Sequence, residues 1–407
     1  MKNSNLLDGS KIPLKLNLRL LSMVIILVVM WVFFRLQVGS FYFSGESFAK
    51  LSRDMVSWTI LAAGATLVIV SGNIDLSVGS LLALCAATAA ILINPDYGLG
   101  LSASIAVPIA ILVGTLLGAF QGFLTAYFKI PSFIVTLGGF FVFRGVTQKV
   151  SAFDPRVPDK SWIVRIGFDY IPQNIGWILG IAACIIMAVV LLWTSAKKKK
   201  LNIEALPLWL TISKIVIFSL IILLFILKVN QYKGLPYQTL VMFVVLVALF
   251  IISKNTRFGR YLYAIGGNMQ AARLSGIKVE RKIVGVFALM GMLAGVAGVL
   301  WMAQNQGSTK NAGEFYELYA IAAAVIGGTS LMGGRGTIFG TFLGGLVMAT
   351  VIQGMDYTSL DNWLQLVVRG SVLVLAVGID IMTKNPPLWM QQFKYKLSFK
   401  NSKVRSN

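Results

Sequence analysis

The sequence predicts an all-α integral membrane protein, a polytopic helical bundle of about 12 transmembrane spans with both termini in the cytoplasm. Hydrophobic residues make up 57% of the 407-residue chain and charged residues only 13%, whereas soluble domains have about 45–50% and about 25%. Apolar runs of roughly 20 residues, the length that crosses a bilayer as a helix, recur along the chain. The formal net charge of +21 lies in short segments beside these runs, which indicates a lipid bilayer rather than nucleic acid as the partner.

The spans can be placed to within a few residues. We expect them at 18–38, 55–71, 76–94, 102–128, 132–148, 173–195, 208–229, 236–253, 283–303, 316–330, 337–355 and 363–383. Those at 76–94, 132–148 and 316–330 are short or rich in Gly, Pro and Ser, so broken or re-entrant helices are an alternative there. The first run is too long for a signal-peptide core and is expected to stay as a span.

The distribution of Lys and Arg sets the orientation, because cationic loops stay in the cytoplasm. Three basic clusters fall on one side of the twelve-span arrangement: Lys197–Lys200, the loop 254–282 and the tail 384–407. We therefore expect a cytoplasmic N-terminus at 1–17, a transmembrane domain at 18–383 and a cytoplasmic tail at 384–407 that lies on the anionic inner leaflet.

The loop 254–282 carries seven Lys/Arg against one acid, Glu280. Gly266 and Gly267 before Asn268 are a turn signal, and Asn268 is suited to cap a short helix that ends near Gly276. A membrane protein that builds a small helix on its cytoplasmic face commonly offers it to a partner. The structural alternative is an amphipathic surface helix without a partner.

Several residues within or beside the spans have two possible roles. Asp75, between two apolar runs, is most simply an N-cap of the following helix, and the alternative is contact with a translocation path or gate. Arg144 and Arg369 lie near span ends, where long cationic side chains are expected to reach towards the interface. Small residues at four-residue spacing indicate close helix packing, with a pathway lining as the alternative; they are Gly114, Gly118, Gly122, Gly291, Gly295, Gly340 and Gly344.

The sequence offers little for catalysis. There is no histidine, and both cysteines, Cys85 and Cys184, lie in apolar runs as packing residues. The dipeptide Gly-Lys does not occur, so a Walker A phosphate loop is absent. We expect no catalytic, metal-binding or cofactor-binding residue. An intramembrane enzyme would need paired acids or histidines, and an ion-coupled secondary transporter would need ionisable residues deep within its spans, of which few are present.

Five segments together resemble the permease subunits of bacterial ABC-type sugar importers of the ribose, galactose and xylose family. They are Ser71–Ser80, Ile130–Gly139, Thr256–Asn268, Ala271–Ile277 and Ala324–Gly334. An inserted helix pair at about 173–229 is similar to the xylose-type permeases, so D-xylose is the expected substrate, with ribose or galactose as alternatives. The resemblance implies a transport subunit in the bacterial plasma membrane, working as a homodimer with a separate cytoplasmic ATPase and an extracytoplasmic sugar-binding protein.

The resemblance also implies site residues. The loop that couples to the ATPase carries Arg257, Gly259, Arg260, Gly266, Gly267, Asn268, Ala271, Ala272, Arg273, Leu274 and Gly276. Candidates for the pathway or a gate are Asn73, Asp75, Ser77 and Thr136. The outer loop 149–172 offers contacts for the binding protein at Asp154, Arg156, Asp159, Lys160 and Arg165. Because the spans supply few polar groups able to converge on a sugar, specificity is expected to lie mainly in the binding protein.

Overall fold

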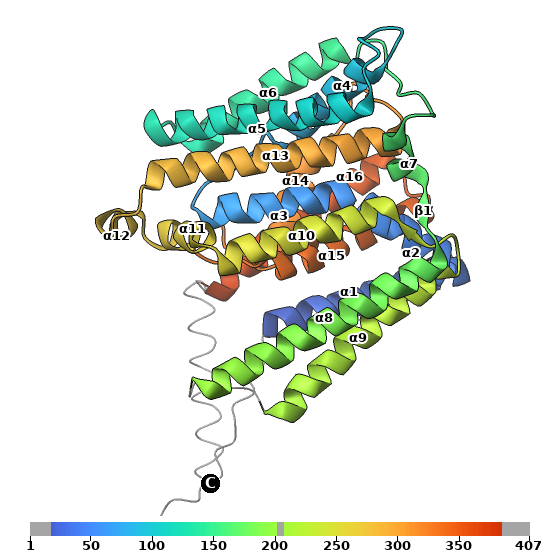
Figure 1. The fold of residues 1–407 in the computed structure, drawn as a ribbon, viewed down its shortest axis with the longest axis vertical. Coiled ribbons are helices and arrows are strands. Elements are labelled where there is room, and N and C mark those ends of the chain that lie inside the picture. Colours follow the sequence, from blue (N-terminus) through green and yellow to red (C-terminus); the bar gives the residue numbers. More distant parts are fainter. Residues whose placement is uncertain (1–17, 202–206, 385–407) are drawn as a thin grey trace, which may run out of the picture.

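The computed structural model describes residues 18–201 and 207–384. Most helices run along one common direction, with short helices and strands at the two ends of the bundle (Figure 1). The helices are α1 (Leu18–Val38), η1 (Ser40–Phe43), α2 (Gly45–Asp54), α3 (Val56–Val70), α4 (Val78–Ile93), α5 (Ala103–Tyr127), α6 (Ser132–Val150), α7 (Trp162–Phe168), α8 (Gln173–Lys200), α9 (Leu208–Asn230), α10 (Tyr237–Asn255), α11 (Arg257–Gly267), α12 (Met269–Leu274), α13 (Val279–Asn305), α14 (Tyr316–Ile326), α15 (Ile338–Tyr357) and α16 (Asn362–Lys384). Two short strands, β1 (Tyr170–Ile171) and β2 (Leu235–Pro236), pair antiparallel.

A polytopic, nearly all-helical membrane protein is confirmed. Each expected span coincides with one long or apolar helix, and the ends differ by at most five residues. Within the described residues, seven helices are long and apolar enough to cross a membrane, or eight if α2 and α3, bent by 44° at their junction, form one span. The apolar helices α4 and α14 are shorter than that.

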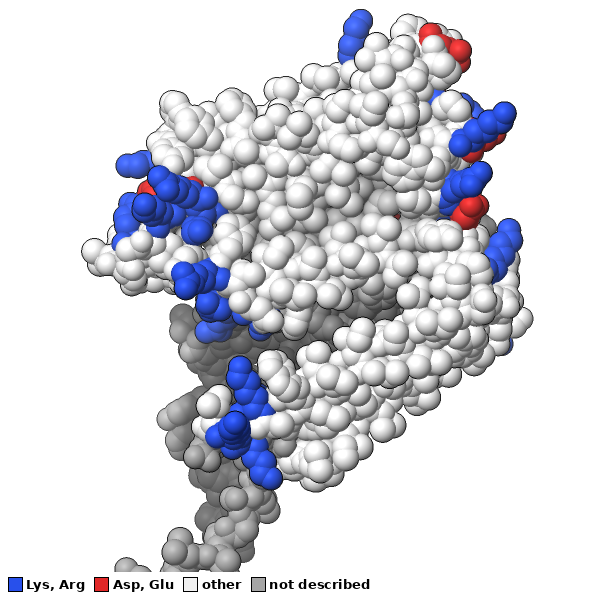
Figure 2. All heavy atoms as spheres, in the orientation of Figure 1, with Lys and Arg blue, Asp and Glu red and all other residues white. Residues whose placement is uncertain are grey.

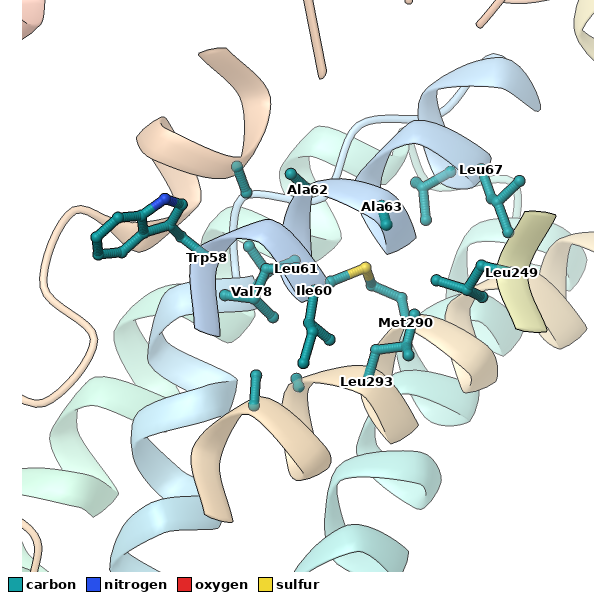
Figure 3. Packing of buried hydrophobic residues seen from close by; sticks show 14 of the residues in the cluster. Trp58, Ile60, Leu61, Ala62, Ala63, Leu67, Val78, Leu249, Met290 and Leu293 are labelled. Atoms are coloured by element: carbon teal, nitrogen blue, oxygen red, sulfur yellow. The ribbon is translucent and has the colours of Figure 1, made fainter. Parts of the chain in front are cut away.

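The centre of the bundle is built around α3 and α13. Every residue of α3 is buried, and side chains such as Ile60 and Leu61 pack with Met290 and Leu293 of α13 (Figure 3). Such a helix is apolar all round because neighbouring helices enclose it.

The small residues at four-residue spacing act in helix packing. A Cβ on Gly118 of α5 would lie only 2.9 Å from the Cα of Gly291 of α13, and one on Gly295 would lie 2.7 Å from Ile111 Cα. Gly340 and Gly344 of α15 pack in the same way against the backbone at the end of α14. Because glycine has no side chain, these backbones can touch. Such close packing drives helix association in a membrane, where the hydrophobic effect does not.

The inserted pair, α8 and α9, lies at the edge of the bundle (Figure 1). Only 11% of the apolar window of each helix is buried, and the two pack mainly on one another through Gly180 and Ile226. Exposed apolar helices of this kind are stable only against lipid or another apolar surface. Towards one end of α9, Val229 packs with Ala49 of α2 and with Ile171 and Leu235 of the two strands.

Two helices start inside the bundle. At 1.5 Å per residue, α4 (16 residues) and α14 (11 residues) are about 24 and about 16 Å long, against a hydrocarbon core of about 30 Å. The irregular segments 71–77 and 306–315 precede them, and Gly313 of the second packs against Gly79 of the first turn of α4. Non-helical backbone at membrane depth is tolerated where protein buries it or where it lines a cavity.

Candidate functional site

The loop between α10 and α13 folds into two helices, of which only the second was expected. Thr256 caps the unexpected helix α11, since its Oγ1 accepts a hydrogen bond from Gly259 N at 3.1 Å. Leu262 and Ile265 bury their side chains in the central core, with Phe258 packed against it. Thr256 followed by apolar residues at 258, 262 and 265 is the pattern of a capped, amphipathic helix, so a local signal for α11 is present in the sequence.

The second helix, α12, forms as predicted. The Oδ1 atom of Asn268 accepts a hydrogen bond from Ala271 N at 2.9 Å. The helix ends before Gly276, whose φ of +80° is a left-handed conformation that glycine adopts at little cost. Arg273 pairs with Glu280 at the start of α13, which fixes α12 against the next helix.

The residues implied for coupling fall into a buried set, an exposed set and Gly266, which is half-buried. Gly259 and Ala272 are buried within this chain, so neither can contact an ATPase in this conformation. Leu274 is 90% exposed, which is unusual for a leucine in an ordered helix. The other exposed members are Arg257, Arg260, Gly267, Asn268, Ala271, Arg273 and Gly276.

Positive charge is concentrated at the end of the molecule that holds α11 and α12. Figure 2 shows a largely uncharged belt between two charged ends, and Lys and Arg gather at the end that holds α11 and α12. Met332, in the loop between α14 and α15, is 86% exposed. This loop is held to α11 by a hydrogen bond of 2.8 Å from Tyr263 Oη to Gly336 O. Two exposed apolar side chains, Leu274 and Met332, thus lie on loops that are tied together through α11.

The four candidate pathway residues come together in the structure. Asn73, Asp75, Ser77 and Thr136 are each at most 7% exposed. Thr136 Oγ1 accepts a hydrogen bond from Leu76 N at 3.1 Å and so ties α6 to the segment 71–77. Asn73 Nδ2 donates to Ser71 Oγ at 3.0 Å.

Asp75 is not the N-cap of α4, which corrects that hypothesis. The N-cap residue is Ser77. Asp75 Oδ1 accepts hydrogen bonds from Ser77 N at 2.8 Å and from Ser77 Oγ at 2.7 Å. The carboxylate thus closes an Asx-type turn just ahead of the helix.

Two further residues, Gln121 and Ser132, complete this cluster, and neither was among the predicted site residues. Gln121 of α5 donates from Nε2 to Ser77 Oγ at 3.0 Å, and Ser132 Oγ of α6 accepts from Ile74 N at 3.1 Å. Polar residues within apolar runs were the available signal, but their partners lie about 44 and 58 positions away. The cluster satisfies the backbone of a segment that would otherwise carry unpaired N–H groups in an apolar environment.

The expectation that Arg144 and Arg369 reach towards the interface is wrong. Arg144 Nη1 donates to Ala312 O at 2.7 Å and so fixes the irregular segment ahead of α14. Arg369 Nη1 donates to Tyr319 Oη at 2.6 Å. Both guanidinium groups find acceptors inside the protein, which stabilises them more than partial hydration at a boundary.

The opposite end of the bundle carries the loop 151–172. All five of its candidate contact residues, Asp154, Arg156, Asp159, Lys160 and Arg165, are exposed. Its backbone is nevertheless fixed: Asn94 Nδ2 donates to Arg156 O at 2.8 Å, and Gln306 Nε2 donates to Asp159 Oδ1 at 2.9 Å. The exposed rings of Tyr97 and Phe153 stack beside it with centroids 5.4 Å apart.

Comparison with known proteins decides the family. Residues 47–377 match the family described as branched-chain amino acid transport system / permease component. The chain belongs to this family. It is 36% identical over 370 residues to the xylose transport system permease protein XylH of Escherichia coli K12, an alignment that covers 91% of this chain and 93% of that protein.

Two further relatives extend the comparison. The XylH protein of Haemophilus influenzae is 36% identical over 90% of this chain and 97% of its own length. The ribose import permease protein RbsC of Escherichia coli K12 is 33% identical over 84% of this chain and 87% of its own length. No solved structure gives a significant match. The permease is thus a transport subunit located in the inner membrane.

Proposed function

We propose that this permease forms the translocation pathway of an ATP-driven importer for a monosaccharide, D-xylose. The observation that carries the proposal is the 36% identity to a xylose permease across 91% of the chain. The ribose permease is less similar and is matched over a smaller share of this chain. The inserted pair α8 and α9, in which only 11% of each apolar window is buried, supports the same assignment.

The proposed topology has twelve spans with both termini in the cytoplasm. Twelve helices, counting α2 and α3 together, coincide with the expected spans. The end that holds α11 and α12 is the cytoplasmic one, because it gathers Lys and Arg (Figure 2). The end that holds α7 and β1 is then the outer one.

ATP hydrolysis belongs to a separate cytoplasmic ATPase in this proposal. Its docking surface is the exposed side of α12, with Leu274 as the apolar anchor and Arg273 beside it. Met332 lies on the adjoining loop and enlarges the same surface. An apolar side chain ringed by polar and cationic neighbours is the usual composition of an interface centre and its rim.

A sugar-binding protein would deliver the substrate to the outer end. The five exposed charges of the loop 151–172 supply polar contacts there, and the stacked rings of Tyr97 and Phe153 supply an apolar one. The fixed backbone of this loop favours docking, since little conformational entropy is lost on binding.

Reconstitution tests the whole proposal. The permease should be co-purified with the ATPase and the binding protein encoded beside it and placed in proteoliposomes. We expect ATP-dependent uptake of radiolabelled xylose that exceeds uptake of ribose and galactose. Uptake of ribose above xylose would assign the chain to the ribose type, and uptake driven by an ion gradient without ATP would contradict the importer class.

A further inference from the structure

Three aromatic rings from two helices meet in the outer half of the bundle. Trp58 of α3 contacts Tyr316 and Tyr319 of α14 edge to face, with ring centroids 5.6 and 6.1 Å apart. In Figure 3 the Trp58 ring projects away from the aliphatic side chains of the central core. Tyr316 and Tyr319 lie three residues apart and therefore on one face of α14. Since α14 begins inside the bundle, this face lies at the point where irregular backbone turns into helix.

Charged and amide groups surround the rings. Arg369 of α16 lies over the ring of Tyr319 at 5.6 Å and donates to its hydroxyl. The same guanidinium donates through Nη2 to Gln365 Oε1 at 2.5 Å. On the outer side, Gln304 Nε2 donates to Asp54 Oδ1 at 2.8 Å. Residues from α2, α3, α13, α14 and α16 thus bring aromatic faces, an amide pair and ionic groups to one place.

Two buried polar groups of this region lack partners among the described residues. Trp58 is 5% exposed, yet its Nε1–H has no acceptor. Arg369 Nε likewise has none. A buried donor without an acceptor destabilises a protein, and an ordered water or a ligand can supply the missing acceptor. Two unsatisfied donors, Trp58 Nε1 and Arg369 Nε, thus belong to the residues that bring the three rings together.

The cluster also connects to the outer surface. Asp54 and Arg53 lie at the bend between α2 and α3, and their side chains are 32% and 23% exposed. Asp54 and Arg53 precede Trp58 by four and five residues in the chain, so partly exposed charged groups lie close to the aromatic rings. Direct contact with lipid is excluded for Trp58, because the surrounding helices bury it.

We propose that this cluster is a monosaccharide-binding site on the route through the permease. Trp58, Tyr316 and Tyr319 would pack against the C–H groups of the sugar ring, and Trp58 Nε1 and Arg369 Nε would donate to its hydroxyl oxygens. A sugar presents both kinds of surface at once, whereas a metal ion or a lipid chain presents only one. The inference rests on the proposed function, and it moves part of the sugar recognition into the spans, where it was not expected.

The test uses the full complex of permease, ATPase and binding protein in proteoliposomes. Trp58→Phe keeps a ring but removes the indole N–H, and Tyr319→Phe removes the acceptor of Arg369. Trp363→Phe is the matched control, because Trp363 lies on α16 with 64% exposure and outside the cluster. At saturating sugar we expect Trp58→Phe and Tyr319→Phe to lower the uptake rate about threefold to tenfold, whereas Trp363→Phe should keep the wild-type rate.

Uptake of monodeoxy analogues of the transported sugar distinguishes direct contact between Trp58 and the sugar from a purely structural role of Trp58. The binding protein is the same for every variant, so any change in the ratio of rates arises in the permease. One analogue will lack the hydroxyl that Trp58 binds. Wild type and Trp58→Phe should transport this analogue at equal rates, because the hydrogen bond is absent in both cases. Wild-type rates in both variants, or the same loss for every analogue, would overturn the site. Absence of sugar uptake by the wild-type complex would instead overturn the proposed function.

Discussion

Gly266, near the end of α11, lies directly against the carbonyl oxygen of Val70, the last residue of α3, so closely that a Cβ at Gly266 would overlap it. The same oxygen accepts a hydrogen bond from Gly334 N at 2.9 Å. Because close-packed backbones leave no slack, a displacement of the coupling loop reaches α3 directly. The other end of α3 carries Trp58. One rigid helix therefore joins the proposed ATPase contact to the proposed sugar site.

Two neighbouring glycines give a matched test of this contact. Gly266→Ala should destabilise the folded protein by about 1–3 kcal/mol, because the new methyl meets fixed backbone. Gly267→Ala should leave stability nearly unchanged, since nothing lies within 4 Å of a Cβ there. Thermal unfolding of the two detergent-purified variants is the measurement. Equal melting temperatures would contradict the packing described at Val70.

Docking of the ATPase should depend on Leu274. Leu274→Glu should leave the fold intact, because 90% of this side chain is exposed. It should weaken association with the ATPase about tenfold to a hundredfold, the loss expected when one leucine is no longer buried in an interface. Leu201→Glu is the control, since Leu201 is also exposed but lies at the end of the peripheral helix α8. Binding of both variants to the ATPase at wild-type strength would remove α12 from the docking surface.

Asp75 should act through its hydrogen bonds rather than its charge. Asp75→Asn keeps an oxygen that can accept from Ser77 N and Ser77 Oγ, so uptake should remain close to wild type. Asp75→Ala leaves two buried donors without this acceptor and should cost about 1–3 kcal/mol of stability. Expression level, thermal stability and uptake should be compared for both. A well-folded Asp75→Asn protein without uptake would favour the alternative, a charged gate.

Close packing of α5 against α13 should require glycine, which has no side chain, at position 291. A Cβ on Gly291 would lie 3.0 Å from Gly118 Cα and would overlap Gly114 O. Gly291→Ala should therefore destabilise the protein by about 1–3 kcal/mol, although alanine is the better helix former. Gly138→Ala on α6 has open space for its methyl and should be neutral or slightly stabilising. Thermal unfolding of both variants provides the comparison.

The importer should contain two copies of this permease. One chain supplies one coupling loop, whereas a two-fold pair would supply two to a dimeric ATPase, and closed two-fold symmetry is the commonest oligomer. Native mass measurement of the solubilised complex should give two permease chains. A transport-competent complex with a single permease chain would exclude the dimer.

Local sequence patterns were sufficient to predict the membrane class, the approximate ends of most long helices and the capped helix at 268–274. Each of these follows from local chemistry. A run of about 20 apolar residues has few alternatives to a span, and the Asn268 side chain reaches a backbone N–H only three residues away. The motifs that indicated a sugar permease are also contiguous in the chain, so they could be read without knowledge of the fold.

The tertiary structure alone decided which polar residues act together. Trp58, Tyr319 and Arg369 are separated by up to about 310 positions, and no local pattern links them. Arg144 and Arg369 looked like interfacial residues because the sequence shows distance from a span end but not the acceptor on a neighbouring helix. Asp75 looked like an N-cap because the sequence does not show at which residue the backbone becomes helical. Contacts between distant segments depend on how helices pack, and packing is set by the whole set of apolar faces at once.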